Sequence, residues 1–225
     1  DNYTEIGNSN DWAGKANQGN SDIIMLGARG LKDPNNVYVE GWGFAPVTKA
    51  LNDAFLPNDP RKWTTIIDHE EFRAEGGTVS SDVNQYTGYS VRKYHPRAGY
   101  SSTVGTEALN YKNNYRVIRF SDVLLMASEA LLRSGGSVGE AQDYYARVVK
   151  RAMGDDYKVP VVSLDNIYKE RRYEFAMEGI RYWDLVRTNQ AKDFIKGWDD
   201  TKKYLPIPQS EIDKSDGHLV QNPHF

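Results

Sequence analysis

The sequence has no cysteine among its 225 residues. Disulfide bonds, thiolate catalysis and cysteine-ligated metal sites are therefore excluded, although a lack of cysteine does not by itself fix the compartment. No stretch approaches the roughly 18 consecutive apolar residues of a membrane span, and the opening "DNYTEIGNSN" lacks the basic start and the apolar run of a signal peptide. We therefore expect either a cytosolic protein or a mature or partial chain.

Positive charge is not in excess, because 28 Lys and Arg residues stand against 31 Asp and Glu residues, giving a net charge of -3. Such a balance offers no general attraction for a phosphate backbone, so nucleic acid is not expected as a partner. The sequence also lacks G-x-S-x-G, G-x-x-x-x-G-K-[ST] and G-x-G-x-x-G. Hydrolase, phosphate-loop and dinucleotide functions have no support from motifs, and no cofactor is expected.

Histidine is rare, and the four residues are scattered along the chain: His69, His95, His218 and His224. None has a second histidine four residues away, and H-E-x-x-H does not occur. The segment "DHEE" at 68–71 could surround a cation with carboxylates, but four successive polar residues are more typical of a solvated turn. The sequence predicts no metal site.

Aromatic residues are abundant, with 15 Tyr, 7 Phe and 5 Trp making up 12% of the chain. Burial in a core accounts for most such rings. Rings that remain at the surface suit the recognition of ligands that have both apolar and polar faces.

The first part of the chain, residues 1–114, is interrupted by Gly, Asn, Asp and Pro and predicts mostly loops. A short helix is expected over 46–55, where Pro46 opens it and Pro57 and Pro60 in "LPNDPR" end it. The segments "KWTTII" (62–67) and "YSVRKY" (89–94) are typical of short strands. Residues 1–114 are thus predicted to be the loop-rich part of the chain.

The second part, residues 115–225, has helical periodicity and predicts a scaffold. One helix is expected over 120–134, with a shared apolar face and a stop at Gly135-Gly136; the face consists of Phe120, Val123, Leu124, Ala127 and Leu131. A second helix within 139–154 would return as an antiparallel hairpin of tetratricopeptide type. A single hairpin cannot bury both apolar faces, so we expect the chain to be part of a longer helical protein.

A third helix is predicted from an N-cap at Ser163 through Glu178, with Gly179 as its break. It carries Glu170, Glu174 and Glu178 at four-residue spacing, a row that could bind metal, transfer protons or hold helices together. The row is flanked by arginines that would keep the carboxylates ionised: Arg171, Arg172, Arg181 and Arg187. The adjoining "FAM" and "YWDL" are apolar. We therefore interpret the row as a partly buried, charge-paired part of a scaffold, without catalytic residues.

Several motifs in order resemble one known family: "YRVIRFSDVLLMASEALL", "ARVVKRAMG", "LDNIYKERRYEFAMEGIRYWDLVR", "KYLPIPQSEID" and "QNPHF". Together with "NYTEIG", "PVTKALNDAFLPNDPR" and "GYSVRKY", they are similar to the C-terminal half of the SusD/RagB family. The resemblance spans essentially the whole chain. It implies a mainly α fold, with a tetratricopeptide-type hairpin scaffold, long irregular loops and a few short strands, in a chain about twice this length. By the same resemblance, residues 1–114 would be the ligand-facing part and residues 115–225 the helical scaffold.

The resemblance also implies a function. Members of this family are surface-exposed lipoproteins of the outer membrane of Bacteroidetes, which capture oligosaccharides or polysaccharides for uptake through a SusC-like TonB-dependent transporter. The expected protein is a non-enzymatic carbohydrate-binding protein of a polysaccharide-utilization system. The resemblance implies an N-terminal lipid anchor on a cysteine that this chain lacks, which fits a truncated or cleaved chain.

Candidate ligand-binding residues are sought in the aromatic loops, because a sugar ring offers a C–H face to stack on and a rim of hydroxyls. Trp12 stands beside Asn10 and Asp11 in "SNDWAG", and a second group is Asn36, Tyr38 and Trp42 in "NNVYVEGWGF". Trp42 could instead fill the core between its glycines. The remaining tryptophans are interpreted as scaffold: Trp63, Trp183 and Trp198.

Two alternatives stay open. The same scaffold could capture peptides, which would require an exposed strand edge such as "KWTTII" or "YSVRKY". A cytosolic helical-repeat adaptor that binds a protein partner through its hairpin is the other possibility.

Overall fold

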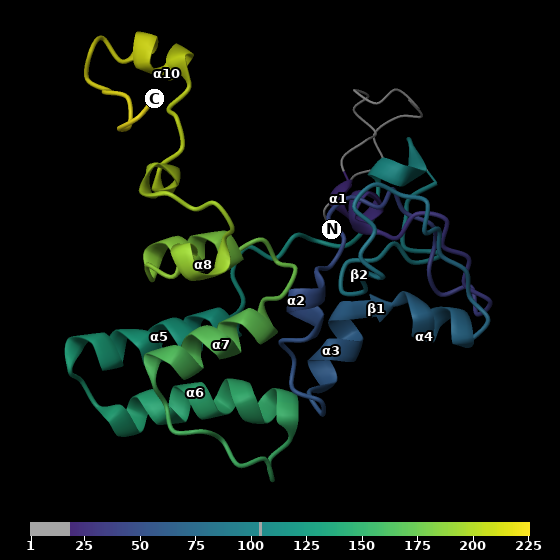
Figure 1. The fold of residues 1–225 in the computed structure, drawn as a ribbon, viewed down its shortest axis with the longest axis horizontal. Coiled ribbons are helices and arrows are strands. Elements are labelled where there is room, and N and C mark those ends of the chain that lie inside the picture. Colours follow the sequence, from purple (N-terminus) through teal and green to yellow (C-terminus); the bar gives the residue numbers. More distant parts are fainter. Residues whose placement is uncertain (1–18, 104) are drawn as a thin grey trace. The chain divides into compact units, whose positions relative to one another are not determined.

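The computed structural model describes residues 19–103 and 105–225, where the fold is mostly helical with one two-stranded sheet (Figure 1). This confirms the mainly helical class. The chain divides into two compact units, the first ending at Glu178 and the second formed by Gly179–Phe225. The division at residue 114 between ligand-facing and scaffold parts stays a prediction. The elements of the first unit are α1 (Asp22–Leu26), α2 (Lys49–Asn52), α3 (Pro60–Thr65), β1 (Ile66–Asp68), α4 (His69–Ala74), β2 (Tyr89–Val91), η1 (Glu107–Leu109), α5 (Phe120–Ser134), α6 (Val138–Met153) and α7 (Leu164–Glu174).

Helices α5 and α6 form the predicted antiparallel hairpin. Gly135 ends α5 in the left-handed conformation at φ 72°, which glycine adopts without strain, and Ser137 caps α6 by accepting from the backbone N–H of Glu140. Between the helices, the Ser128 hydroxyl donates to the carbonyl of Ala141 over 2.7 Å, at a point where both residues are buried. Small residues thus allow the two helices to approach closely at this point.

The buried face of α5 differs from the predicted one. Leu124 and Leu125 are buried, but Phe120 and Val123 are 63% and 44% exposed. Helix α7 packs against α5, and it does not cover the side that carries Phe120. Periodicity alone could not show which edge of the apolar stripe the neighbouring helix covers.

Two of the predicted local structures are wrong. Residues 62–65 of "KWTTII" belong to α3 and not to a strand, because Asp59 caps this helix. Pro60 lies in its first turn, so it begins this helix as well as following the preceding one. The segment "DHEE" is not a solvated turn. Asp68 caps α4 by accepting from the N–H groups of Glu70 and Glu71, and His69 is buried.

The sheet separates two small apolar clusters. Strands β1 and β2 pair antiparallel, with Ile66 opposite Val91 and Ile67 opposite Ser90. Successive side chains of a strand point to opposite faces of the sheet. Ile66 and Val91 therefore belong to one cluster, and Ile67 belongs to the other, together with Phe72 of α4.

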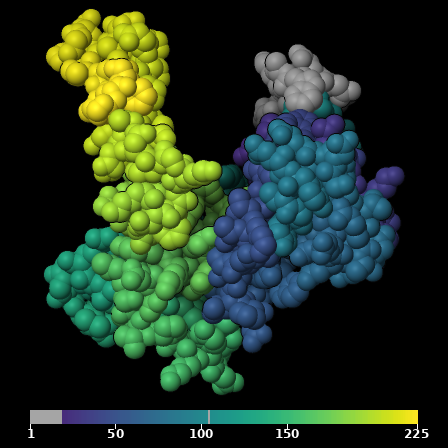
Figure 2. Space-filling model, viewed as in Figure 1, coloured from purple at the N-terminus to yellow at the C-terminus, as the bar shows by residue number. Residues whose placement is uncertain are grey.

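Helix α7 begins at the predicted cap Ser163 but ends at Glu174, one turn earlier than expected. The backbone then turns, with Met177 at φ 62°, so Glu178 lies beyond the helix. Helix α3 contacts both α6 and α7, and in the space-filling view its blue surface lies beside the green surface of α7 (Figure 2). This contact brings the loop-rich segment against the helical scaffold within the first unit.

The second unit contains α8 (Arg181–Arg187), α9 (Ala191–Phe194), η2 (Asp200–Lys203) and α10 (Gln209–Lys214). The ring of Tyr182 contacts Trp183 edge to face and also contacts Trp198, with centroid distances of 5.1 and 6.2 Å. Trp183 and Trp63 are about half exposed, so their scaffold role stays a prediction. No helix in the described parts of the chain is long and apolar enough to cross a membrane.

Candidate ligand-binding site

The carboxylates of α7 are ion-paired with arginines from three other elements. Glu170 accepts from Arg61 of α3 over 2.5 Å. Glu174 accepts from Arg119 over 2.8 Å and from Arg151 of α6 over 2.7 Å, and Arg61 also reaches it. Both carboxylates are buried. The row therefore ties α3, α6 and the start of α5 to α7.

Glu178 joins the same network from beyond the helix. It accepts from Arg119 over 2.8 Å and pairs with Lys93, and it is also buried. The arginines that flank the row serve other partners, since Arg171 pairs with Asp122 and Arg172 donates to the carbonyl of Ala50. The prediction of a buried, charge-paired row is thus confirmed, with most of its cations supplied by distant segments.

Burial and ion pairing move the pKa values of two carboxyls in opposite directions. Burial raises the pKa of Glu170 above its ordinary value despite the Arg61 guanidinium. Burial also acts on Glu174, but the hydrogen bonds and charges of Arg119 and Arg151 outweigh it and lower the pKa. Glu170 borders a hollow of about 220 Å³, where it presents an ion pair with Arg61 and no free carboxylic acid.

A second hollow, of about 450 Å³, lies over an aromatic edge of the loop-rich segment. We call it the Trp42 surface, and it is lined by Arg29, Glu40, Gly41, Trp42 and Phe44. The rings of Trp42 and Phe44 meet edge to face at 6.3 Å, and Phe44 is 58% exposed. Trp42 also packs partly against the first apolar cluster. It therefore both fills the core and lines an open surface.

The glycines around Trp42 explain how this ring is positioned. Backbone N–H groups of Gly41, Trp42 and Phe44 donate to the carbonyls of Ala28, Ile24 and Met25 over 2.8–2.9 Å. A Cβ atom on Gly41 would lie 2.4 Å from the Cα of Gly27, so only glycine permits this approach. The segment is held flat against α1, which fixes the backbone that carries both rings.

The other predicted residues of this segment do not line the hollow. Asn36 is exposed in a turn at φ 52°, and the Asp33 carboxylate accepts from the backbone N–H groups of that turn. The Tyr38 ring contacts His95 at 5.1 Å and lies beneath the guanidinium groups of two arginines. The structure thus brings only Trp42 to this surface, and the role of Asn36 and Tyr38 in binding stays a prediction. Trp12, Asn10 and Asp11 lie outside the described residues.

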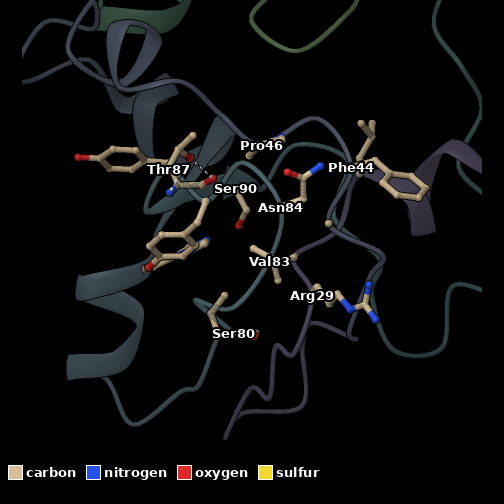
Figure 3. A pocket seen from close by; sticks show the side chains of 15 residues that line it. Arg29, Phe44, Pro46, Ser80, Val83, Asn84, Thr87 and Ser90 are labelled. Carbon is tan, nitrogen blue, oxygen red and sulfur yellow. Dashed lines mark hydrogen bonds between the residues drawn. The ribbon is translucent and has the colours of Figure 1, made fainter.

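A smaller pocket adjoins the Trp42 surface (Figure 3). We call it the His69 pocket; its floor contains His69 and Ser90, and its rim contains Phe44, Asn84 and Tyr86. In Figure 3, Val83, Asn84 and Ser90 lie toward the centre, whereas the Arg29 guanidinium and the Phe44 ring point outward. Arg29 and Phe44 line both hollows, so the two hollows adjoin at these side chains.

Burial lowers the pKa of His69 to about 4, with the Arg73 charge acting in the same direction and Asp68 opposing it. The imidazole is therefore neutral at pH 7 and offers one N–H donor and one acceptor nitrogen. No group of three His, Asp or Glu side chains that could hold a metal ion occurs within 19–103 and 105–225.

Sequence reasoning missed this pocket because "DHEE" looks polar throughout. The signal that could have found it is the alternation Ile67–His69 at the end of a strand, which places the histidine on the side of a buried residue. That Ser90 lies near His69 could be known only from the register of β1 and β2.

The sequence and the fold match one family. The SusD family model matches residues 66–225, and the chain belongs to this family, as the motif resemblance predicted. Surface glycan-binding protein A from Bacteroides thetaiotaomicron is 33% identical, with a TM-score of 0.82 over 99% of this chain and 50% of that chain. It also has a structure in complex with laminarihexaose, which matches 98% of this chain and 50% of that chain at 33% identity with a TM-score of 0.81.

Two further relatives agree. A laminarin-binding SusD-like protein is 36% identical, with a TM-score of 0.81 over 97% of this chain and 47% of that chain. SusD-like protein P2 from Formosa agariphila is 24% identical over 89% of this chain and 44% of its own length. The chain thus spans about half the length of the relatives it matches.

Proposed function

We propose that the protein binds glycans at the bacterial cell surface without cleaving them. The observation that carries this proposal is the Trp42 surface, an open hollow that combines two rings with Arg29 and Glu40. Support comes from the membership of the SusD family and from relatives whose names include glycan or laminarin binding. Laminarin-type oligosaccharides are therefore the first ligands to test.

Binding would combine stacking with hydrogen bonding. A sugar ring lays its C–H face on the exposed Phe44 ring and the partly buried Trp42 ring, while Arg29 donates to hydroxyls and Glu40 accepts from them. The Glu40 carboxylate is held by the backbone N–H of Gly30 over 2.7 Å, which orients it before the ligand arrives. A shallow, hydrated site of this kind corresponds to affinities from about μM to mM, or roughly 4 to 8 kcal/mol.

Catalysis is not part of the proposal. The carboxylates Glu170 and Glu174 are buried and paired with arginines, and neither lines the Trp42 surface. They do not lie beside the proposed ligand, and their role is to stabilise the fold.

The family membership supports a further part of the proposal. The protein would be held at the outer-membrane surface by an N-terminal lipid anchor and would deliver its glycan to a SusC-like TonB-dependent transporter. Co-purification of such a transporter from outer membranes tests this part.

Isothermal titration of the full chain with laminarihexaose and a panel of other glycans tests the proposed function. Trp42→Ala should weaken binding about tenfold, because it removes the stacking ring, which corresponds to about 1.4 kcal/mol. Trp63→Ala is the matched control, since Trp63 is half exposed on α3 and lines neither hollow.

Equal affinities of wild type, Trp42→Ala and Trp63→Ala would contradict the placement of the ligand at the Trp42 surface. Absence of binding to every glycan, together with binding of a peptide mixture, would instead favour peptide capture. Release of new reducing ends from laminarihexaose would contradict the non-enzymatic part of the proposal.

A further inference from the structure

Two buried polar side chains in the His69 pocket have no hydrogen-bond partner among the described residues. His69 and Ser90 are each 5% exposed, and both ring nitrogens of His69 and the Oγ of Ser90 are unpaired. A buried polar group without a partner costs about 1–3 kcal/mol. Folded proteins therefore rarely keep such groups unless water or a ligand completes them.

His95 provides the contrast within the same unit. It is 2% exposed and its pKa is likewise lowered by burial to about 4, yet both of its ring nitrogens are paired. The backbone N–H of Ala28 donates to its Nε2 over 3.0 Å, and its Nδ1 lies 3.1 Å from the Pro96 carbonyl. A neutral, buried histidine of this unit can thus have hydrogen-bond partners at both ring nitrogens, whereas His69 has none in the described parts of the chain.

The strand register brings His69 and Ser90 to one place. Ser90 is opposite Ile67, and the backbone N–H of His69 donates to the Gly88 carbonyl over 3.0 Å. His69 therefore follows Ile67 on the face to which Ser90 also points. The Tyr86 ring lies against the imidazole with a centroid distance of 5.4 Å. These contacts place His69 and Ser90 on one face of the sheet, where both residues line the pocket.

The size and position of the pocket limit what can complete these groups. The space inside is about 20 Å³, which is room for about one water-sized group. Its rim is accessible, since Phe44, Asn84 and Tyr86 are exposed. The rim residue Phe44 is also part of the Trp42 surface. A ligand on that surface thus lies next to an opening that admits a single hydroxyl group.

We propose that the His69 pocket is a subsite that receives one hydroxyl group of the glycan bound at the Trp42 surface. The hydroxyl donates to the acceptor nitrogen of the neutral His69 and accepts from the Ser90 hydroxyl, so that one group pairs both side chains. This inference rests on the proposed glycan-binding function. It adds a polar selection step to the stacking, because a ligand without a hydroxyl at that position leaves His69 and Ser90 unpaired.

Titration of the full chain with laminarihexaose and with its singly deoxygenated analogues tests the subsite. Ser90→Ala and His69→Phe should each weaken laminarihexaose binding about threefold to tenfold, as expected for loss of one hydrogen bond. Wild type should discriminate against one deoxygenated analogue by a similar factor, and Ser90→Ala should lose this discrimination. Ser128→Ala, a buried serine of the α5–α6 hairpin, should leave affinity unchanged.

The outcomes separate the two proposals. If Trp42→Ala weakens binding while Ser90→Ala and His69→Phe leave both affinity and discrimination unchanged, the pocket holds only a structural water and the subsite is wrong, although the glycan-binding function stands. If wild type binds no glycan, both proposals fail. Thermal unfolding of each variant shows whether it is folded, and the analogue series on wild type decides the question if His69→Phe does not fold.

Discussion

The Glu170–Glu174–Glu178 network and the His69 pocket both contain buried polar side chains, but these side chains are paired in the network and, within the part of the chain that the structure describes, unpaired in the pocket. In the network, each of the three carboxylates is paired with at least one arginine, and Glu174 meets three. In the pocket, the side chains of His69 and Ser90 have no hydrogen-bond partner among the described residues. The first arrangement completes its hydrogen bonds inside the chain and serves stability. The second leaves them incomplete, as a binding site does before its ligand arrives.

Breaking the network should have the largest effect. Arg61→Met removes the shared partner of Asp59, Glu170 and Glu174 and leaves buried charges without compensation. We expect a loss of about 3–5 kcal/mol in the free energy of unfolding. Urea denaturation of the variant measures this loss.

Arg147→Met is the matched control, because Arg147 is exposed on α6 and its guanidinium lies over the Phe120 ring. We expect it to change stability by less than about 0.5 kcal/mol. Equal, small losses in both variants would show that the network does not hold the scaffold together.

Acid should have the next largest effect. The pKa of His69 and that of His95 are about 4 in the folded chain, whereas an unfolded histidine titrates at 6.5. The unfolded chain therefore binds more protons between these pH values, so each histidine lowers stability as pH falls from 6.5 to 4. At pH 4.5 the loss is on the order of 2–3 kcal/mol for each of them.

Urea unfolding at pH 7 and pH 4.5 isolates the His69 contribution when wild type is compared with His69→Phe. The variant should lose less stability on acidification than wild type, because one of the two titrating groups is gone. An identical pH dependence would contradict the buried, neutral state of His69.

A pair of serine substitutions sharpens the comparison with a smaller effect. Ser128→Ala removes a buried hydrogen bond to the Ala141 carbonyl and should cost about 1 kcal/mol. Ser90→Ala removes a buried hydroxyl without a protein partner, so it should not lower stability and should raise it by about 1 kcal/mol. Thermal or urea unfolding of both variants measures the difference. A loss of stability in Ser90→Ala would mean that its hydroxyl is already paired in the free protein.

The sequence predicted the helical scaffold well because local signals determine it. The Gly135 stop, the Ser163 cap and the hairpin were predicted from the residues that form them. Helix α7 ended early because the left-handed Met177 turns the chain, and nothing in its side chain indicates such a backbone. The cations that pair with the carboxylate row could not be predicted from local spacing either, since Arg61 is more than one hundred positions away from Glu170 in the sequence.

The candidate site was predicted only in part. Trp42 was predicted because it is an aromatic residue in a loop that also carries Asn36 and Tyr38, and the structure places it at an open surface. The adjoining Phe44 was missed because an apolar residue before a helix start looks like core. His69 and Ser90 were missed because their meeting depends on the register of two short strands, which is a property of the folded chain.

Nuclear magnetic resonance of the two histidine side chains during a laminarihexaose titration tests the comparison most directly. Both imidazoles are buried in the same unit, but only His95 has its hydrogen bonds completed by the protein. We predict saturable shifts of the His69 ring nitrogens, with the His95 ring nitrogens unchanged. Saturated binding that moves neither ring, or moves both equally, would contradict it.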